Sequence, residues 1–217
     1  MGAMMKQIKE IYEELFLRYN TLEVCRYEIW ESYEIIKQSY KNGGKLLIAG
    51  NGGSAADAEH IVGELMKGFV KSRKLSKTFV EKLKSIDEYM GIELGEKIQG
   101  AMPAIALVDH VALSTAYLND VDPLLGFAQQ INGYGKPEDV FFAISTSGNS
   151  KNILYACTIA KAKDMKVVAL TGKDGGKLKE MSDVAIVVPE SETFKIQELH
   201  LPVYHCLCLM LEETFFG

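Results

Sequence analysis

The stretch Gly50-Asn51-Gly52-Gly53-Ser54-Ala55-Ala56-Asp57-Ala58-Glu59-His60-Ile61-Val62-Gly63-Glu64 decides how this chain is organised. It follows a short apolar run at 45–49 that is typical of a buried strand, and it leads into residues that favour a helix. Glycines and a serine at such a junction let backbone N–H groups point toward an anion at a helix N-terminus, where the helix dipole also favours negative charge. The stretch therefore predicts a phosphate-binding turn between a strand and a helix.

His60 and Glu64 lie four residues apart in the predicted helix, so their side chains share one of its faces. An imidazole and a carboxylate at this spacing suit either proton transfer or metal binding. Taken singly, a helical histidine is more often the partner of a polar group at a core edge, and a glutamate is more often a surface charge. The pair is therefore a candidate site whose role depends on what lies beside it.

Length and composition predict one domain over residues 1–217, because 47% hydrophobic and 24% charged residues can build one sizeable core. A formal charge of −5 and a pI near 5.5 argue against a nucleic-acid partner. The longest apolar runs are strand-sized and no signal peptide is evident, so we expect no membrane partner and a cytoplasmic location. The cysteines show no Cys-x-x-Cys spacing and are expected to fill the core: Cys25, Cys157, Cys206 and Cys208.

Two segments stand apart from the rest of the chain. Residues 1–43 predict two N-terminal helices with a break near Asn20, where Thr21 can cap the second helix. Their apolar stripe must be covered either by the domain or by another copy, and we favour another copy. Residues 70–102 form an insertion whose apolar spacing predicts one amphipathic helix followed by a glycine-punctuated loop. A solvated helix over a sheet edge and a substrate-contacting lid are both compatible with this pattern.

Short apolar segments alternate with helical patterns through the remainder of the chain. Strands are expected at 45–49, 104–108, 139–145, 166–171 and 183–188, with helices at 111–118, 122–134, 150–163 and 194–213. Nearly all-apolar strands separated by helices indicate a parallel sheet that is covered on both faces. The fold class is therefore α/β, a doubly wound five-stranded parallel sheet of flavodoxin-like order 2-1-3-4-5 with an N-terminal helical extension.

A second polar turn, Ser145-Thr146-Ser147-Gly148-Asn149-Ser150, follows the third strand. By itself, such a turn is more often a helix cap than a ligand site. In the order 2-1-3-4-5, however, strands 1 and 3 are neighbours, and ligands bind at their carboxyl ends. The two turns together therefore predict one phosphate or sugar-phosphate crevice.

Four ordered motifs resemble the sugar isomerase (SIS) domain family, and within it the D-sedoheptulose 7-phosphate isomerase (phosphoheptose isomerase) branch. They are 50–54 with Asp57, 145–150, 170–176 and 196–198, and the resemblance covers nearly the whole chain except 70–102. It implies the SIS fold and an aldose–ketose isomerase. The expected reaction converts sedoheptulose 7-phosphate to D-glycero-D-manno-heptose 7-phosphate through an enediol.

The resemblance also implies roles for individual residues. Glu64 and His205 match the catalytic acid/base pair of the family. The ligands of a zinc ion in this family are matched by His60, Glu64, Gln197 and His205. The substrate-binding positions are matched by Asn51, Gly52, Gly53, Ser54, Asn119, Asp120, Ser145, Thr146, Ser147, Ser150 and Gln197. The assembly that the resemblance implies is a homotetramer, and we expect its active sites to be shared between subunits.

The implied residue types suit the implied chemistry. Moving a proton between C1 and C2 calls for a carboxylate that takes the carbon-bound proton and a histidine that transfers protons at the sugar oxygens. A zinc ion could polarise the carbonyl or simply hold the site together. Gln197 and His205 are eight residues apart, about 12 Å along a straight helix, whereas zinc–ligand bonds are about 2 Å long. Either Pro202 kinks the helix or one of the two comes from a neighbouring chain, and we favour the neighbour.

Two departures from the family pattern leave the substrate open. The insertion 70–102 is longer than the corresponding connection, and Lys67-Gly68-Phe69 stands where the family often has Gly-Arg-aromatic. The alternatives are an isomerase or sensor for another sugar phosphate, or a non-catalytic SIS protein that binds the replication initiator DnaA. Because Glu64 and His205 are both present, the sequence favours an enzyme.

Overall fold

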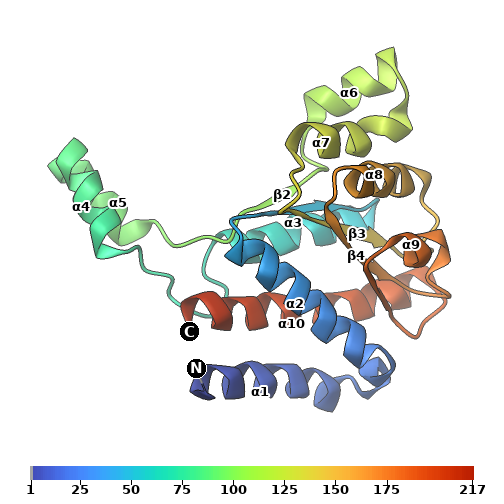
Figure 1. The fold of residues 1–217 in the computed structure, drawn as a ribbon, viewed down its shortest axis with the longest axis horizontal. Coiled ribbons are helices and arrows are strands. Elements are labelled where there is room, and N and C mark those ends of the chain that lie inside the picture. The colour runs from blue at the N-terminus through green and yellow to red at the C-terminus, as the bar shows by residue number, and fades with distance from the viewer. Residues whose placement is uncertain (1) are drawn as a thin grey trace.

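The computed structural model describes residues 2–217, so Met1 of the N-terminal extension lies outside the described part. A central sheet carries helices on both faces, and one helical hairpin projects away from it (Figure 1). The strands are β1 (Leu46–Ala49), β2 (Ala104–Ala106), β3 (Val140–Ser145), β4 (Lys166–Thr171) and β5 (Val184–Val187). All neighbouring strands pair in parallel in the order β2-β1-β3-β4-β5, which confirms the predicted sheet.

The helices account for most of the remaining chain. In chain order they are α1 (Gly2–Arg18), α2 (Arg26–Lys41), α3 (Gly53–Met66), α4 (Lys77–Ile86), α5 (Glu88–Lys97), α6 (Val111–Asp120), α7 (Gly126–Tyr134), α8 (Lys151–Ala162), α9 (Gly176–Met181) and α10 (Thr193–Phe216). Two 3₁₀ turns are η1 (Asn20–Cys25) and η2 (Pro123–Leu125). The helix expected at 122–134 is thus split into η2 and α7, and the short α9 was not predicted. Within residues 2–217, no helix combines the length and apolar character needed to cross a membrane.

Successive residues of the strands point to opposite faces of the sheet and enter two different cores. Leu46, Phe142 and Leu170 pack with α1, α2, α3 and α10 on one face. Leu47 and Phe141 pack with α7, α8 and α9 on the other. Because helices cover both faces, these strands read as continuous apolar runs rather than as alternating patterns. All four cysteines are buried and free, which confirms their predicted role as core residues.

The N-terminal helices differ from the prediction in two respects. Thr21 does not cap α2, because η1 intervenes and Cys25 occupies the N-cap position. The apolar stripe is also not kept for another copy. Ile8 and Leu15 of α1 and Tyr33 of α2 are buried in this chain's own core, together with residues of α10. The long apolar α10 supplies a covering surface within the chain, which the helical periodicity of residues 1–43 could not reveal.

The insertion 70–102 contains two helices, α4 and α5, rather than one helix and a loop. Asp87 ends α4 and begins α5, where its carboxylate accepts a hydrogen bond from the Met90 N–H. Gly91 and Gly95, which suggested a loop, instead allow α5 to approach α4 closely. A Cβ at Gly91 would collide with the backbone of Lys84. The glycines that suggested a loop in the sequence therefore form the face of α5 that packs closely against α4.

A buried ion pair between Arg73 and Glu212 fastens the insertion to the domain. Arg73 Nε donates to Glu212 Oε1 at 2.8 Å, and its guanidinium also donates to the carbonyl oxygens of Leu65 at 2.6 Å and Glu64 at 2.9 Å. The carboxylate accepts from three backbone N–H groups, those of Phe69, Val70 and Lys71. Burial raises the pKa of Glu212, but the amide hydrogen bonds and Arg73 outweigh it, so the net pKa lies below the usual range.

We expect Glu212→Gln to lower the free energy of unfolding at pH 7 by about 3–5 kcal/mol, because the Arg73 charge then stays buried without its counter-charge. The lowered pKa means that the pair contributes fully above the unfolded carboxyl pKa of about 4.3 and less as pH falls through the folded value. The difference between wild type and variant should therefore shrink in acid. Urea unfolding measures both effects.

The exposed Glu10, which pairs with Lys6 at 3.8 Å, provides the control. Glu10→Gln should change the free energy of unfolding by less than about 1 kcal/mol. Equal stability of Glu212→Gln and wild type at pH 7 would show that the buried pair does not fasten the insertion.

Candidate functional site

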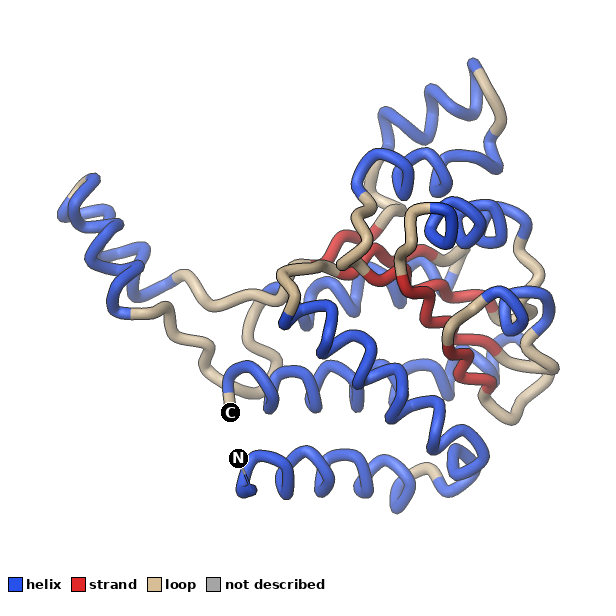
Figure 2. The backbone as a smooth tube through the Cα atoms, in the orientation of Figure 1, coloured by secondary structure: helices blue, strands red, loops and turns tan. Residues whose placement is uncertain are grey.

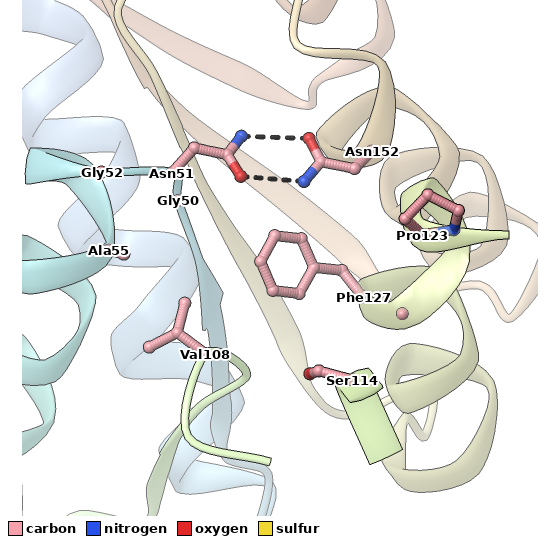
Figure 3. Close-up of a pocket in the computed structure, with 10 residues that line it drawn as sticks. Gly50, Asn51, Gly52, Ala55, Val108, Ser114, Pro123, Phe127 and Asn152 are labelled. Atoms are coloured by element: carbon pink, nitrogen blue, oxygen red, sulfur yellow. Dashed lines mark hydrogen bonds between the residues drawn. The ribbon is translucent and has the colours of Figure 1, made fainter. Parts of the chain in front are cut away.

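A cavity of about 280 Å³ opens at the carboxyl ends of β1 and β3 (Figure 3). Its walls come from the turn after β1, the start of α3, the segment after β2, and the helices α6, α7 and α8. The lining residues are Gly50, Asn51, Gly52, Ala55, Val108, Ser114, Pro123, Gly126, Phe127 and Asn152. Gly52 adopts a positive φ of 57°, which suits glycine and lets the chain turn sharply into α3. The positive end of the α3 dipole thus lies at this cavity, as the sequence predicted.

Asn51 and Asn152 face each other across the cavity and join the two predicted polar turns (Figure 3). Asn51 Nδ2 donates to Asn152 Oδ1 at 3.0 Å, and Asn152 Nδ2 donates to Asn51 Oδ1 at 2.8 Å. A ligand that enters between the two amides must replace both bonds. Sequence reasoning missed Asn152, although its place two residues after Ser150, in the first turn of a helix, was a usable signal.

The turn after β3 is hydrogen-bonded to α9, the short helix that follows β4. Gly148 has a φ of 63°, and the Leu178 N–H donates to its carbonyl oxygen at 2.9 Å. The hydroxyl oxygens of Ser145 and Ser150 lie 3.0 Å apart across the turn. The predicted residues of this turn stand beside the cavity rather than in its lining: Ser145, Thr146, Ser147 and Ser150. Their closest link to the lining is Asn152 at the start of α8.

The remaining predicted sugar contacts fall into two groups. Gly53, Ser54 and Gln197 gather at the start of α3, where a Cβ on Gly53 would lie 2.5 Å from Gln197 Nε2. Asn119 and Asp120 lie instead at the exposed end of α6, where the Asn119 amide donates to the Asp120 carboxylate at 2.7 Å. Neither of them lines the cavity, so this pair does not lie at the cavity within one chain.

His60, Glu64 and His205 meet where α3 packs against α10. His60 Nε2 is 3.2 Å from Glu64 Oε1, and the rings of His60 and His205 are 5.0 Å apart between centroids. The ring of Phe69 lies 5.3 Å from that of His205. His205 also borders a second cavity of about 190 Å³ between α1 and α10. The predicted catalytic pair is therefore assembled within one chain, on two helices far apart in sequence.

Tyr204 orients His60, a role that the sequence did not indicate. The Tyr204 hydroxyl donates to Asp57 Oδ1 at 3.2 Å and lies 3.0 Å from His60 Nδ1. Because its single proton goes to Asp57, the neutral His60 ring must carry its own proton on Nδ1 and donate it to Tyr204. His60 Nε2 then presents a lone pair to the Glu64 carboxylate. Two facing lone pairs at this distance are an arrangement that a proton or a cation stabilises.

The pKa values in this cluster favour a neutral His205. Burial lowers the pKa of His205, His60 lowers it further when it is itself protonated, and Glu64 partly offsets both. Burial raises the pKa of Asp57, although the hydrogen bond from Tyr204 and the charge of His60 lower it. Within residues 2–217, His205 Nε2 and Glu64 Oε2 are buried and have no hydrogen-bond partner. His205 Nε2 is therefore free to accept a proton or to bind a cation, whereas Glu64 Oε2 lies 3.7 Å from the Lys67 ammonium and forms an ion pair with it.

Zinc was expected on four residues, and one chain does not bring all four together. Within the described residues, no three or more His, Cys, Asp or Glu side chains form a group that could hold a metal ion. The imidazole and carboxylate donors of His60, Glu64 and His205 are of a type that fits zinc. Gln197 of α10, however, lies beside Gly53 at the start of α3. Helix α10 continues through Pro202 without interruption.

Comparison with known proteins identifies the family. The SIS domain model matches residues 96–172. The chain is 38% identical over 207 residues to a phosphoheptose isomerase of Nitratiruptor sp., covering 95% of this chain and 97% of the relative. The chain belongs to the phosphoheptose isomerase family. A phosphoheptose isomerase of Leptospira biflexa is 42% identical over 184 residues, which are 85% of this chain and 82% of that protein.

Two solved structures of the phosphoheptose isomerase family share the fold. The protein from Francisella tularensis matches with a TM-score of 0.73 and 31% identity, over 95% of this chain and 97% of its own. The protein from Neisseria gonorrhoeae matches with a TM-score of 0.72 and 30% identity, over 96% and 98%. The SIS fold, the isomerase class and the family that the sequence motifs predicted are thus confirmed.

We expect Asn152→Ala to weaken the binding of a sugar phosphate by roughly 3- to 30-fold, as for the loss of about one or two hydrogen bonds, because the ligand then lacks the Asn152 amide as a hydrogen-bond partner. Isothermal titration calorimetry with sedoheptulose 7-phosphate measures the change. Thr158→Ala, which removes an exposed hydroxyl from the same helix α8, should bind as wild type does. Unchanged affinity of Asn152→Ala would remove the amide pair from the binding site.

Proposed function

We propose that this protein interconverts sedoheptulose 7-phosphate and D-glycero-D-manno-heptose 7-phosphate through an enediol. The observation that carries the proposal is the meeting of His60, Glu64 and His205 in a member of the phosphoheptose isomerase family. They lie beside a sheet whose turns after β1 and β3 we assign to phosphate binding and call the cradle. No specific observation favours a sensor or a DnaA-binding protein. The location that fits such metabolism is the cytoplasm.

The cradle holds the phosphate at one end of the open-chain sugar. The turn after β1 and the start of α3 supply backbone donors and the positive dipole end, and the serine turn after β3 supplies hydroxyls. At the other end, Glu64 takes a proton from C1 and returns it to C2, while His205 exchanges the hydroxyl proton between O1 and O2. The lowered pKa of His205 keeps it neutral and able to accept that proton at neutral pH.

The distance between these two ends supports an active site shared between subunits. Ser54 and Glu64 are ten residues apart on α3, which is about 15 Å along the helix axis. An extended seven-carbon sugar spans only about 10 Å from phosphate to C1, given C–C bonds of about 1.5 Å. We therefore assign the cradle and Gln197 to one subunit and His60, Glu64 and His205 to a neighbour. A homotetramer is the assembly that we propose, following the family resemblance.

The donor types of the shared site suit zinc, although within the described residues of one chain His60, Glu64 and His205 do not by themselves form a group that could hold a metal ion. His60, Glu64 and His205 of one subunit would hold the ion together with the partner subunit's Gln197, which in each chain lies beside the cradle at Gly53. When bound there, the metal supplies a Lewis acid for the sugar carbonyl. Tyr204 and Asp57 orient the His60 ring so that its Nε2 faces the Glu64 carboxylate.

We expect Glu64→Gln to lower kcat by about 10²- to 10⁴-fold, because the amide cannot take the C1 proton. Binding of the sugar phosphate should stay nearly intact, since the cradle lies elsewhere on α3. Steady-state kinetics and calorimetry separate the two effects. Glu59→Gln, which changes an exposed carboxylate on the same helix, should leave kcat unchanged. Wild-type turnover of Glu64→Gln would remove Glu64 from the mechanism.

Subunit mixing tests the shared site. Ala55→Asp places a carboxylate in the cradle and should prevent phosphate binding by charge repulsion, while Ala55→Asn controls for side-chain size. Inactive Ala55→Asp and Glu64→Gln proteins, mixed and allowed to exchange subunits, should regain about a quarter of wild-type activity if sites form randomly across an interface. Glu64→Gln mixed with His205→Ala should stay inactive, because both residues belong to the same chain's half-site. No recovery despite exchange seen by native mass spectrometry would show that each site is built within one chain.

A further inference from the structure

The hairpin of α4 and α5 lacks support from the rest of the described chain. It projects from the domain on two loops (Figures 1 and 2), and the main contacts of each helix are with the other. No residue of α4 is buried, and in α5 only Gly91 is. Helices of ten residues are marginal in water by themselves, since tertiary packing supplies most helical stability. The two helices therefore stabilise each other, and their outer faces have no partner among the described residues.

The hairpin also concentrates exposed apolar side chains. Ile86 is 84% exposed and Tyr89 is 80% exposed, on either side of the junction at Asp87. The other large exposed apolar residues of the hairpin and its C-terminal end are Phe79, Met90, Ile92 and Leu94, with Ile98 just beyond α5. A patch of this kind on a soluble domain marks an interaction surface.

Charge on the hairpin is divided between its two helices. Helix α4 carries Lys77, Lys82 and Lys84 against one glutamate, and α5 carries three glutamates against one lysine. The ion pairs found in the hairpin, Lys84–Glu81 and Lys97–Glu93, each stay within one helix. The excess positive charge of α4 and the excess negative charge of α5 are thus not matched to each other inside the hairpin.

We propose that the α4–α5 hairpin is an interface between two copies of this chain, paired about a two-fold axis so that α4 of each copy faces α5 of the other. Two-fold pairing places the same patch on itself, so the basic helix meets the acidic helix twice and the apolar side chains are buried together. A foreign partner of one charge sign would match only one of the two helices. The result is a four-helix bundle in which the Gly91–Gly95 face of α5 keeps each hairpin tight.

Charge reversal in the full-length protein tests this pairing. Lys77→Glu with Lys82→Glu makes both helices acidic, and Glu88→Lys with Glu96→Lys makes both basic, while the two ion pairs within the helices remain. Each variant should need at least about tenfold more protein than wild type to reach the same association in sedimentation velocity. A mixture of the two variants should associate within about threefold of wild type, because each acidic helix then meets a basic one.

A second variant keeps the test independent of charge. Ile86→Gln with Tyr89→Gln alters two exposed side chains that support no core without changing the charge, and it should remove the same association step while far-UV circular dichroism shows an intact fold. Lys177→Glu with Lys179→Glu makes the same charge change on α9 as Lys77→Glu with Lys82→Glu makes on α4, and it should associate as wild type does. Wild-type association of the Ile86/Tyr89 variant, wild-type association of both charge-reversed variants, or failure of their mixture to recover would each overturn the proposal.

Discussion

The position of β1 between β2 and β3 is the constraint on which the site depends. The chain leaves β1 toward one face of the sheet through α3 and leaves β3 toward the other through α8, so the two turns diverge above neighbouring strand ends. This divergence creates the cavity and places Asn51 opposite Asn152. Any pairing that separated β1 from β3 would leave two ordinary helix caps instead of one crevice.

The contact between α3 and α10 brings together the residues to which we assign the acid/base chemistry. Tyr204 and His205 are adjacent on α10, and one orients His60 while the other stands beside it. Arg73 binds the backbone at Glu64 and Leu65 and pairs with Glu212 at the end of α10, so the same two helices are joined again below the cluster. Positioning of the proposed acid/base pair and attachment of the insertion thus share one structural support.

That support also explains how the hairpin can extend from the domain without disturbing the site. The buried guanidinium and carboxylate hold the start of the insertion through several hydrogen bonds, whereas α4 and α5 beyond them contribute almost nothing to the core. The long departure from the family pattern is therefore an addition at the surface. Its helices expose apolar side chains, which is the basis for the interface that we propose.

Local signals in the sequence were enough to predict the sheet and the glycine turn that borders the cavity. Continuous apolar runs gave the strands, and glycine–serine turns at their ends marked Asn51, Gly52 and the segment 145–150. The four ordered motifs were also enough to predict the family.

Local periodicity could not show that the stripe of α1 and α2 is covered by α10, since an amphipathic helix records that a face is buried and not what buries it. The tertiary structure was needed to show that Gly91 and Gly95 pack two helices together and that Tyr204 orients His60. It also showed that Gln197 lies beside Gly53, whereas His205 lies beside His60. Each of these depends on contacts between residues far apart in the chain, where side-chain geometry rather than local preference sets the outcome.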